Sequence, residues 1–218
     1  MASKNSIKTY LGNSYYHIYN RGVEKRPIFH DEQDYAIFLS YLKTYLLPKD
    51  EKLLKEIISN PNAGWREKDQ ALKLLRLNNF DGEIALLAYS LMPNHFHFLI
   101  KQRSEMAIDK FMNSLALRYT MFFNKKYDRV GHLYQSQYKA VLVDSDEQLL
   151  YLTSYIHRNP LTKSLASQDN VLRSCLSQPS SLPEYLGQRK TEWVHPEDIL
   201  TYFSKKNPQL DYKSFIEQ

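Results

Sequence analysis

Two histidines, His95 and His97, stand two residues apart in the apolar run HFHFLIK. In a β-strand, residues i and i+2 point to the same face, so both imidazoles would project together. Two imidazoles on an open face can hold one divalent metal ion. Because the pattern is short, two surface histidines that bind nothing would also explain it.

A tyrosine and an asparagine recur at helical spacing in the segment YLTSYIHRNP. Tyr151, Tyr155 and Asn159 are four residues apart and therefore share one face of a helix. His157 points elsewhere, because it lies about 200° of rotation from Tyr155. The stripe offers a phenol and, one turn on, an amide oxygen able to complete a metal site. The proline after Asn159 disfavours α geometry there, and a buried tyrosine in a helix that ends at Asn-Pro is the alternative.

A basic and aromatic stretch runs from Arg118 to Lys139. Its basic residues are Arg118, Lys125, Lys126, Arg129 and Lys139, and its one acid is Asp128. Interleaved with them are Tyr119, Phe122, Phe123, Tyr127, Tyr134 and Tyr138. Basic groups neutralise phosphates and aromatic faces stack on unpaired bases, which indicates a single-stranded nucleic acid partner. The candidate stacking residues are Tyr119, Tyr134 and Tyr138. An ordinary helix with a charged outer face and aromatic core positions fits the same residues.

The elements that must position these residues follow from hydrophobic periodicity. Strands are expected at 15–20, 83–91, 95–101 and 134–143, and helices at 31–47, 107–126 and 147–159. Their order predicts an α+β domain over residues 1–165, with an antiparallel sheet and helices on one or both faces. Two short apolar stripes predict a helical insertion at 49–82. Residues 166–218 form a C-terminal extension, with a helix near 196–203.

The composition is that of an ordinary globular protein: 218 residues, 43% hydrophobic and 24% charged. No apolar run approaches the ~18 residues of a membrane span, and the first residues lack the apolar core of a secretory signal. The single cysteine, Cys175, excludes an internal disulfide and a multi-cysteine metal site. We therefore expect a cytoplasmic protein with no membrane partner.

Charge and tyrosine content add two further observations. Lys and Arg number 29 against 24 for Asp and Glu, a surplus of 5 that fits a polyanionic partner. The 17 tyrosines suit base stacking, packing or nucleophilic chemistry, and composition does not choose among these.

Four segments together resemble the single-tyrosine HUH transposases, the IS200-like family, and especially its REP-associated tyrosine transposase branch. Met92–Leu99 is similar to the family's His-hydrophobic-His signature, and Tyr155–Pro160 is similar to its catalytic-helix motif. Tyr16–Gly22 resembles the opening strand, and Gly131–Ala140 resembles the segment before the fourth strand. The likeness covers roughly residues 14–165, in the order and spacing of the family.

The resemblance implies an RRM-like or ferredoxin-like antiparallel sheet that carries the His pair on a central strand. It implies Mg²⁺ or Mn²⁺ held by His95, His97 and Asn159, with Tyr155 as the catalytic nucleophile. The implied activity is cleavage and rejoining of single-stranded DNA, often next to a hairpin, by transesterification through a 5′-phosphotyrosine. Relatives act as monomers or as homodimers that exchange their tyrosine helices, so both states stay open.

DNA contacts are expected from ten residues, which lie in the basic and aromatic stretch and in the four segments. They are Arg21, Arg118, Lys125, Lys126, Arg129, Tyr134, Gln135, Tyr138, Lys139 and Arg158. Family members commonly carry arginine where this chain has Gln137, so the resemblance does not imply a phosphate contact at this position.

Two other functions fit the same residues. One is a catalytically silent module that binds structured single-stranded nucleic acid through the basic face. The other is a metal hydrolase for small phosphoesters, which would need a water-activating carboxylate that the sequence does not supply beside the His pair.

Overall fold

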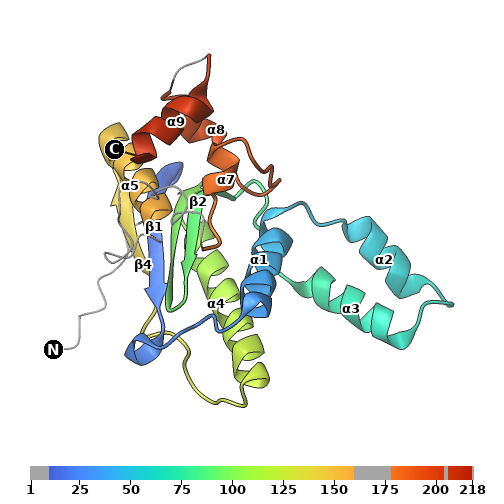
Figure 1. The fold of residues 1–218 in the computed structure, drawn as a ribbon. Coiled ribbons are helices and arrows are strands. Elements are labelled where there is room, and N and C mark those ends of the chain that lie inside the picture. Colours follow the sequence, from blue (N-terminus) through green and yellow to red (C-terminus); the bar gives the residue numbers. More distant parts are fainter. Residues whose placement is uncertain (1–9, 160–177, 204–205, 218) are drawn as a thin grey trace.

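A computed structural model describes residues 10–159, 178–203 and 206–217. Its centre is a four-stranded antiparallel sheet (Figure 1). The strands are β1 (Ser14–Arg21), β2 (Ile84–Met92), β3 (His95–Gln102) and β4 (Lys139–Val143). They lie in the order β2-β3-β1-β4, with helices between β1 and β2 and between β3 and β4. This is the predicted ferredoxin-like α+β arrangement, which is confirmed.

Helices account for most of the remaining described chain. They are α1 (Glu32–Leu46), α2 (Glu51–Ser59), α3 (Trp65–Arg76), α4 (Ala107–Lys126), α5 (Asp146–Arg158), α7 (Leu182–Tyr185), α8 (Glu197–Leu200) and α9 (Pro208–Glu217). The side chains of Asp31, Asp50 and Ser145 accept backbone N–H bonds in the first turns of α1, α2 and α5, which sets where these helices begin. None of the helices described is both long and apolar enough to cross a bilayer.

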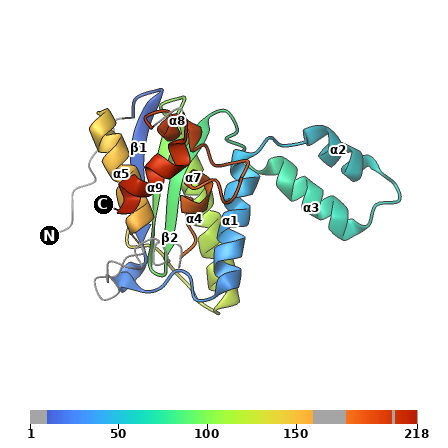
Figure 2. The same cartoon turned by 45° about the horizontal axis from the view of Figure 1, so that its top comes forward.

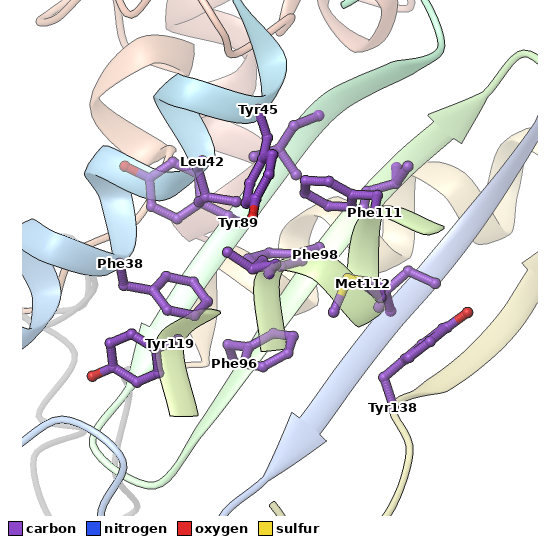
Figure 3. Close-up of a cluster of buried hydrophobic side chains, with 14 of the residues drawn as sticks. Phe38, Leu42, Tyr45, Tyr89, Phe96, Phe98, Phe111, Met112, Tyr119 and Tyr138 are labelled. Atoms are coloured by element: carbon purple, nitrogen blue, oxygen red, sulfur yellow. The ribbon is translucent and has the colours of Figure 1, made fainter. Parts of the chain in front are cut away.

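Helices α1 and α4 cover one face of the sheet. Strand alternation sends Phe96 and Phe98 of β3 to this face, where both are buried. Figure 3 shows them between side chains of the two helices, among them Phe38, Leu42, Tyr45, Phe111, Met112 and Tyr119. This core therefore holds one face of β3 rigidly and leaves the other face for His95 and His97.

Helix α5 and the C-terminal helices lie over the opposite face (Figures 1 and 2). A second core forms there from β2, β3, α5 and the C-terminal segment. Its buried members include Leu87, Ala88, Leu99, Leu149, Leu152, Ile156, Leu182, Tyr185, Ile199, Tyr212 and Ile216. The C-terminal segment thus shares a core with the sheet, while the predicted domain boundary at residue 165 lies outside the described residues.

The C-terminal segment also runs along the outer edge of β2. The Ser181 N–H donates to the Tyr89 carbonyl at 3.0 Å, and the Leu91 N–H donates to the Pro179 carbonyl at 2.9 Å. These bonds pair part of an otherwise open strand edge.

Helices α2 and α3 form the predicted helical hairpin at 49–82, which projects from the body of the molecule (Figures 1 and 2). Its two ends meet at the body, because the Asn79 side-chain amide donates to the Leu47 carbonyl at 2.7 Å. Trp65, the first residue of α3, is 77% exposed.

The strand predicted at 134–143 is wrong in its first half, because β4 begins only at Lys139. Residues 134–138, the crossing segment, pass the end of β1 instead. Tyr134 forms an isolated bridge with Gly22, and the Gln135 N–H donates to the Arg21 carbonyl at 3.0 Å. The predicted helix near 196–203 is a single turn, α8.

Truncation of the β3 core should be costly. We expect Phe98→Ala to lower the free energy of unfolding by about 3–5 kcal/mol, because it empties a fully buried position between α1 and α4. Leu117→Ala, on the exposed side of α4, should change it by less than about 0.5 kcal/mol. Urea denaturation followed by circular dichroism measures both, and equal effects would contradict this assignment of the core.

Candidate active site

The His pair forms the floor of a pocket on the α5 side of the sheet. In the β1–β3 register, His95 lies opposite Arg21 and His97 lies opposite Tyr19, so all four side chains share one face. The pocket has a volume of about 280 Å³. Its lining consists of Tyr19, Asn20, Arg21, His95, His97, Gln135, Ser136, Lys139 and Tyr155.

Tyr155 reaches this pocket from α5. Its ring meets the ring of His97 edge-on, with centroids 5.5 Å apart and planes at 88°. The neighbouring residue Ile156 is buried in the second core and docks the helix on the sheet, while Tyr155 keeps 42% of its surface exposed. Tyr151, one turn earlier, is 70% exposed and is not among the residues that line the pocket. His97 and Tyr155, which are predicted to belong to one site, therefore lie next to each other.

Asn159 lies at the end of α5 and turns its amide towards His95. Its backbone is still helical, with φ −54° and ψ −34°, despite the proline that follows in the sequence. Its Oδ1 lies 3.3 Å from the Nε2 of His95. The side chain of Asn159, whose direction the sequence left open, thus points towards the His pair.

A neighbouring asparagine determines which nitrogen of His95 carries the proton. Asn94 donates from its Nδ2 to the Lys25 carbonyl at 3.1 Å, so its Oδ1 faces the Nδ1 of His95, 2.6 Å away. An amide oxygen only accepts, and therefore His95 must donate from Nδ1. The lone pair of Nε2 then faces the Oδ1 of Asn159, and two acceptors that face each other suit a shared cation.

His17 of β1 is a site residue that sequence reasoning missed. Its Nε2 lies 2.8 Å from the Nδ1 of His97, and the two rings stack with centroids 5.1 Å apart. The ring of Tyr19 also stacks on His97, at 5.6 Å. The sequence does show that His17, Tyr19 and Arg21 have the spacing of residues on one face of a strand. This spacing indicates a site only once β1 is known to pair with β3.

Burial keeps the imidazoles of this cluster neutral. Removal from water, together with the smaller effect of the adjacent His17, lowers the pKa of His97 to about 3. Burial likewise lowers the pKa of His17 to about 4 and moves the pKa of His95 below its ordinary value. Neutral imidazole is the form that binds metal ions.

The donor set fits a divalent cation with open positions. Among the residues that the structure describes, no three His, Cys, Asp or Glu side chains come together as metal ligands. The set here is two imidazole nitrogens and one amide oxygen, from His95, His97 and Asn159. Adjacent ligands of Mg²⁺ lie about 3 Å apart, given octahedral bonds of ~2.1 Å, and the 3.3 Å between His95 Nε2 and Asn159 Oδ1 agrees with that separation.

A family model matches the middle of the chain. Residues 65–159, which are 95 of the 218 residues, match the model described as "Transposase IS200 like". The matched segment holds the His pair, Tyr155 and Asn159, and it begins within α3, so β1 with His17 lies outside it.

A solved structure described as a REP-associated tyrosine transposase bound to a REP hairpin has a similar fold. The TM-score is 0.50 at 8% sequence identity, and the match covers 88% of this chain and 98% of that chain. At this identity the likeness shows the fold alone. No curated protein matches the chain.

Three of the predicted DNA-binding residues line the pocket beside Tyr155. Arg21, Gln135 and Lys139 come from the end of β1, the crossing segment and the start of β4. The ammonium of Lys139 lies 5.7 Å from the centre of the Tyr19 ring. Lys125 is exposed and Arg158 is half-buried, and neither is among the residues that line the pocket.

The three tyrosines predicted to stack on bases are core residues of the protein. Tyr119 is fully buried, and Tyr134 and Tyr138 are 8% and 4% exposed. Tyr119 belongs to the α4 face that packs on α1, Tyr134 meets Phe96 edge-on, and the hydroxyl of Tyr138 donates to Asp109. The stacking prediction is wrong for them, because Tyr119 faces the core from α4, and Tyr134 and Tyr138 pack into the same core from the segment before β4.

The remaining predicted basic residues have partners within the protein. The guanidinium of Arg118 lies over the ring of Tyr41 at 3.9 Å, and Arg129 donates to the side-chain oxygen of Asn124. Lys126 forms ion pairs with Asp31 and the buried Asp34, at 2.8 and 2.7 Å. The structure therefore does not bring the α4 cations to the pocket, and their contact with DNA stays a prediction.

A buried histidine anchors α5 to the C-terminal segment. His157 is fully buried, with Nδ1 2.6 Å from the hydroxyl of Tyr212 and Nε2 2.7 Å from the Oγ of Ser181. Burial lowers its pKa to about 3. The helix that carries Tyr155 is thus held from behind by α9 and by the segment before α7.

Loss of this anchor should destabilise the protein. We expect His157→Ala to lower the free energy of unfolding by about 2–4 kcal/mol, because both hydrogen bonds disappear and a cavity remains. Arg158→Ala, at the neighbouring half-buried position, should cost less than about 1 kcal/mol. Urea denaturation compares the two variants, and a smaller loss for His157→Ala than for Arg158→Ala would rule the anchor out.

Proposed function

We propose that this protein is an IS200-like transposase, a metal-dependent single-stranded DNA endonuclease and strand transferase with Tyr155 as its nucleophile. The observation that carries the proposal is the ring of Tyr155, which lies 5.5 Å from that of His97 in the pocket that also contains His95. The family match supports transposition chemistry. A protein of similar fold is bound to a REP hairpin in its solved structure, which supports a hairpin in the substrate strand.

The reaction is a transesterification at one phosphodiester of the strand. The phenolic oxygen of Tyr155 attacks the phosphorus, and the bond from phosphorus to the 3′ oxygen breaks. The phenol loses its proton, and the leaving 3′ oxygen gains one. The products are a 5′-phosphotyrosine and a free 3′-hydroxyl, and attack by another 3′-hydroxyl joins strands without a nucleotide cofactor. The half-exposed position of Tyr155 leaves its oxygen accessible to the backbone of a bound strand.

His95, His97 and Asn159 would hold Mg²⁺ or Mn²⁺. When bound, the ion would withdraw charge from a non-bridging phosphate oxygen. The protein supports this chemistry with two cations, Arg21 and Lys139, which line the same pocket and can bind the other phosphate oxygens. In the part of the chain that the structure describes, neither residue forms an ion pair, so both charges remain available to a phosphate.

A single strand fits this pocket better than a duplex does. The pocket lies on the sheet surface between α5, the end of β1 and the crossing segment, and a backbone must bend to bring one phosphate to its floor. Unpaired DNA bends readily and exposes base faces for contact with the Tyr19 ring. Each residue of the proposed site comes from the same chain, so a monomer can assemble it.

Replacement of the nucleophile should abolish covalent chemistry. With Mn²⁺ and a hairpin oligonucleotide that carries a single-stranded flank, we expect the wild-type protein to form a covalent adduct on a denaturing gel. Tyr155→Phe should lower the adduct to background, because the attacking oxygen is gone. Tyr151→Phe is the matched control one turn earlier and should form normal adduct, whereas an adduct lost in Tyr151→Phe and kept in Tyr155→Phe would move the nucleophile to Tyr151.

The same gel distinguishes the second candidate function. Tight binding of the oligonucleotide that is unchanged by metal and by Tyr155→Phe, with no cleavage of any tested substrate, would favour a silent binding module over an enzyme.

Removal of the metal or its ligands should have the same effect as removal of the nucleophile. We expect EDTA to abolish adduct formation and excess Mn²⁺ to restore it. His95→Ala and His97→Ala should each lose the adduct, while Asn159→Ala, which removes one neutral oxygen, should need a higher Mn²⁺ concentration. His195→Ala is the control, because this half-exposed imidazole pairs with Glu197 and lies outside the pocket. Full adduct formation by His95→Ala in Mn²⁺ would contradict the metal site.

A further inference from the structure

His17 contacts His97 from the neighbouring strand without lining the pocket. Its Nε2 lies 2.8 Å from the Nδ1 of His97, and His17 is not among the residues that line the pocket. Three rings pack around His17: His97 and Tyr19 in roughly parallel planes, and Tyr155 edge-on at 6.1 Å. The position of its ring is therefore determined by packing as well as by the hydrogen bond.

The short distance between the two ring nitrogens allows only two arrangements. At 2.8 Å one nitrogen must donate a proton and the other must accept it. If His17 donates, a neutral His97 carries its own proton on Nε2 and has no lone pair for a cation in the pocket. If His97 donates from Nδ1, its Nε2 lone pair is free.

The neighbouring ligand shows which arrangement a metal site needs. His95 donates from Nδ1 to the Oδ1 of Asn94, whose orientation depends on its bond to the Lys25 carbonyl. The Nε2 of His95 therefore faces the pocket, opposite Asn159. For His97 to act as the second ligand in the same way, His17 must accept the proton of its Nδ1.

We propose that His17 is a positioning residue, whose Nε2 accepts the Nδ1–H of His97 and so keeps the His97 Nε2 lone pair directed into the pocket. This inference rests on the metal site of the proposed function. It assigns a role in the site to β1, which lies outside the segment matched by the family model.

Two substitutions separate hydrogen bonding from packing. His17→Gln keeps an acceptor oxygen close to the place of Nε2, whereas His17→Phe keeps a ring of similar size and removes the acceptor. Mn²⁺ affinity is measured from the electron paramagnetic resonance signal of free Mn²⁺ at increasing protein concentration. We expect His17→Phe to weaken binding about 10–100-fold and His17→Gln to change it by less than about 5-fold. Val141→Ala, directly opposite His17 on β4, should leave the affinity unchanged.

The tautomer of His97 is measured independently of the metal. Long-range ¹H–¹⁵N correlation spectra of the metal-free wild-type protein should show the His97 proton on Nδ1, and the spectra of His17→Phe should show a mixture of both tautomers. A wild-type His97 with its proton on Nε2 would overturn the inference, whether or not any variant folds. Equal Mn²⁺ affinity of folded His17→Phe and wild type would overturn it too, as would equal weakening by His17→Gln and His17→Phe.

The spectra also separate this inference from the proposed function. If Mn²⁺ binds wild type and His95→Ala equally, the proposed metal site fails. The tautomer of His97 in the wild-type spectra still decides whether His17 accepts its proton.

Discussion

The antiparallel pairing of β1 with β3 is the constraint on which the rest of the site depends. Its register sets Arg21 opposite His95 and Tyr19 opposite His97. A slip by one residue would turn each of these side chains to the other face of the sheet. Gly22 helps to end β1 at this point, because a Cβ there would lie 2.2 Å from the Arg26 carbonyl oxygen. The Gly22 N–H donates to the Asn94 carbonyl at 2.9 Å, which ties the end of β1 to the turn before His95.

The two faces of the sheet contribute to the site in different ways. The α1–α4 side is filled by large aromatic and aliphatic side chains, which position β3 through Phe96 and Phe98. The α5 side is covered over only part of its area, so a pocket remains above the His pair. Helix α5 is held there by its own apolar contacts and by the bonds of His157 to the C-terminal segment. The position of Tyr155 is therefore a consequence of packing behind it as well as of helical spacing.

Local patterns predicted most elements correctly, and two of the failures share one physical cause. The 107–126 helix agrees with α4, and Asp31 caps α1 as expected. The strand at 134–143 and the stacking role of Tyr134 both failed at the segment that crosses the end of β1. Apolar and aromatic residues there pack into the core without adding a strand. A strand and a segment that packs into the core without joining the sheet can have the same composition and the same alternation of apolar residues. Only the position of the neighbouring strand separates the two.

The sequence by itself determined the chemistry that is available: two imidazoles on one side of a strand, and a phenol one helical turn before an amide. Strand and helix periodicity dictates these relations, because they involve residues close together in the chain. Tertiary structure alone decided that the two pairs meet, that His17 joins them from β1, and that the α4 aromatic residues are core. Each of these depends on contacts between residues far apart in the chain, such as His17 and His97 or His95 and Asn159. Such contacts arise from strand register and helix docking, which local spacing does not encode.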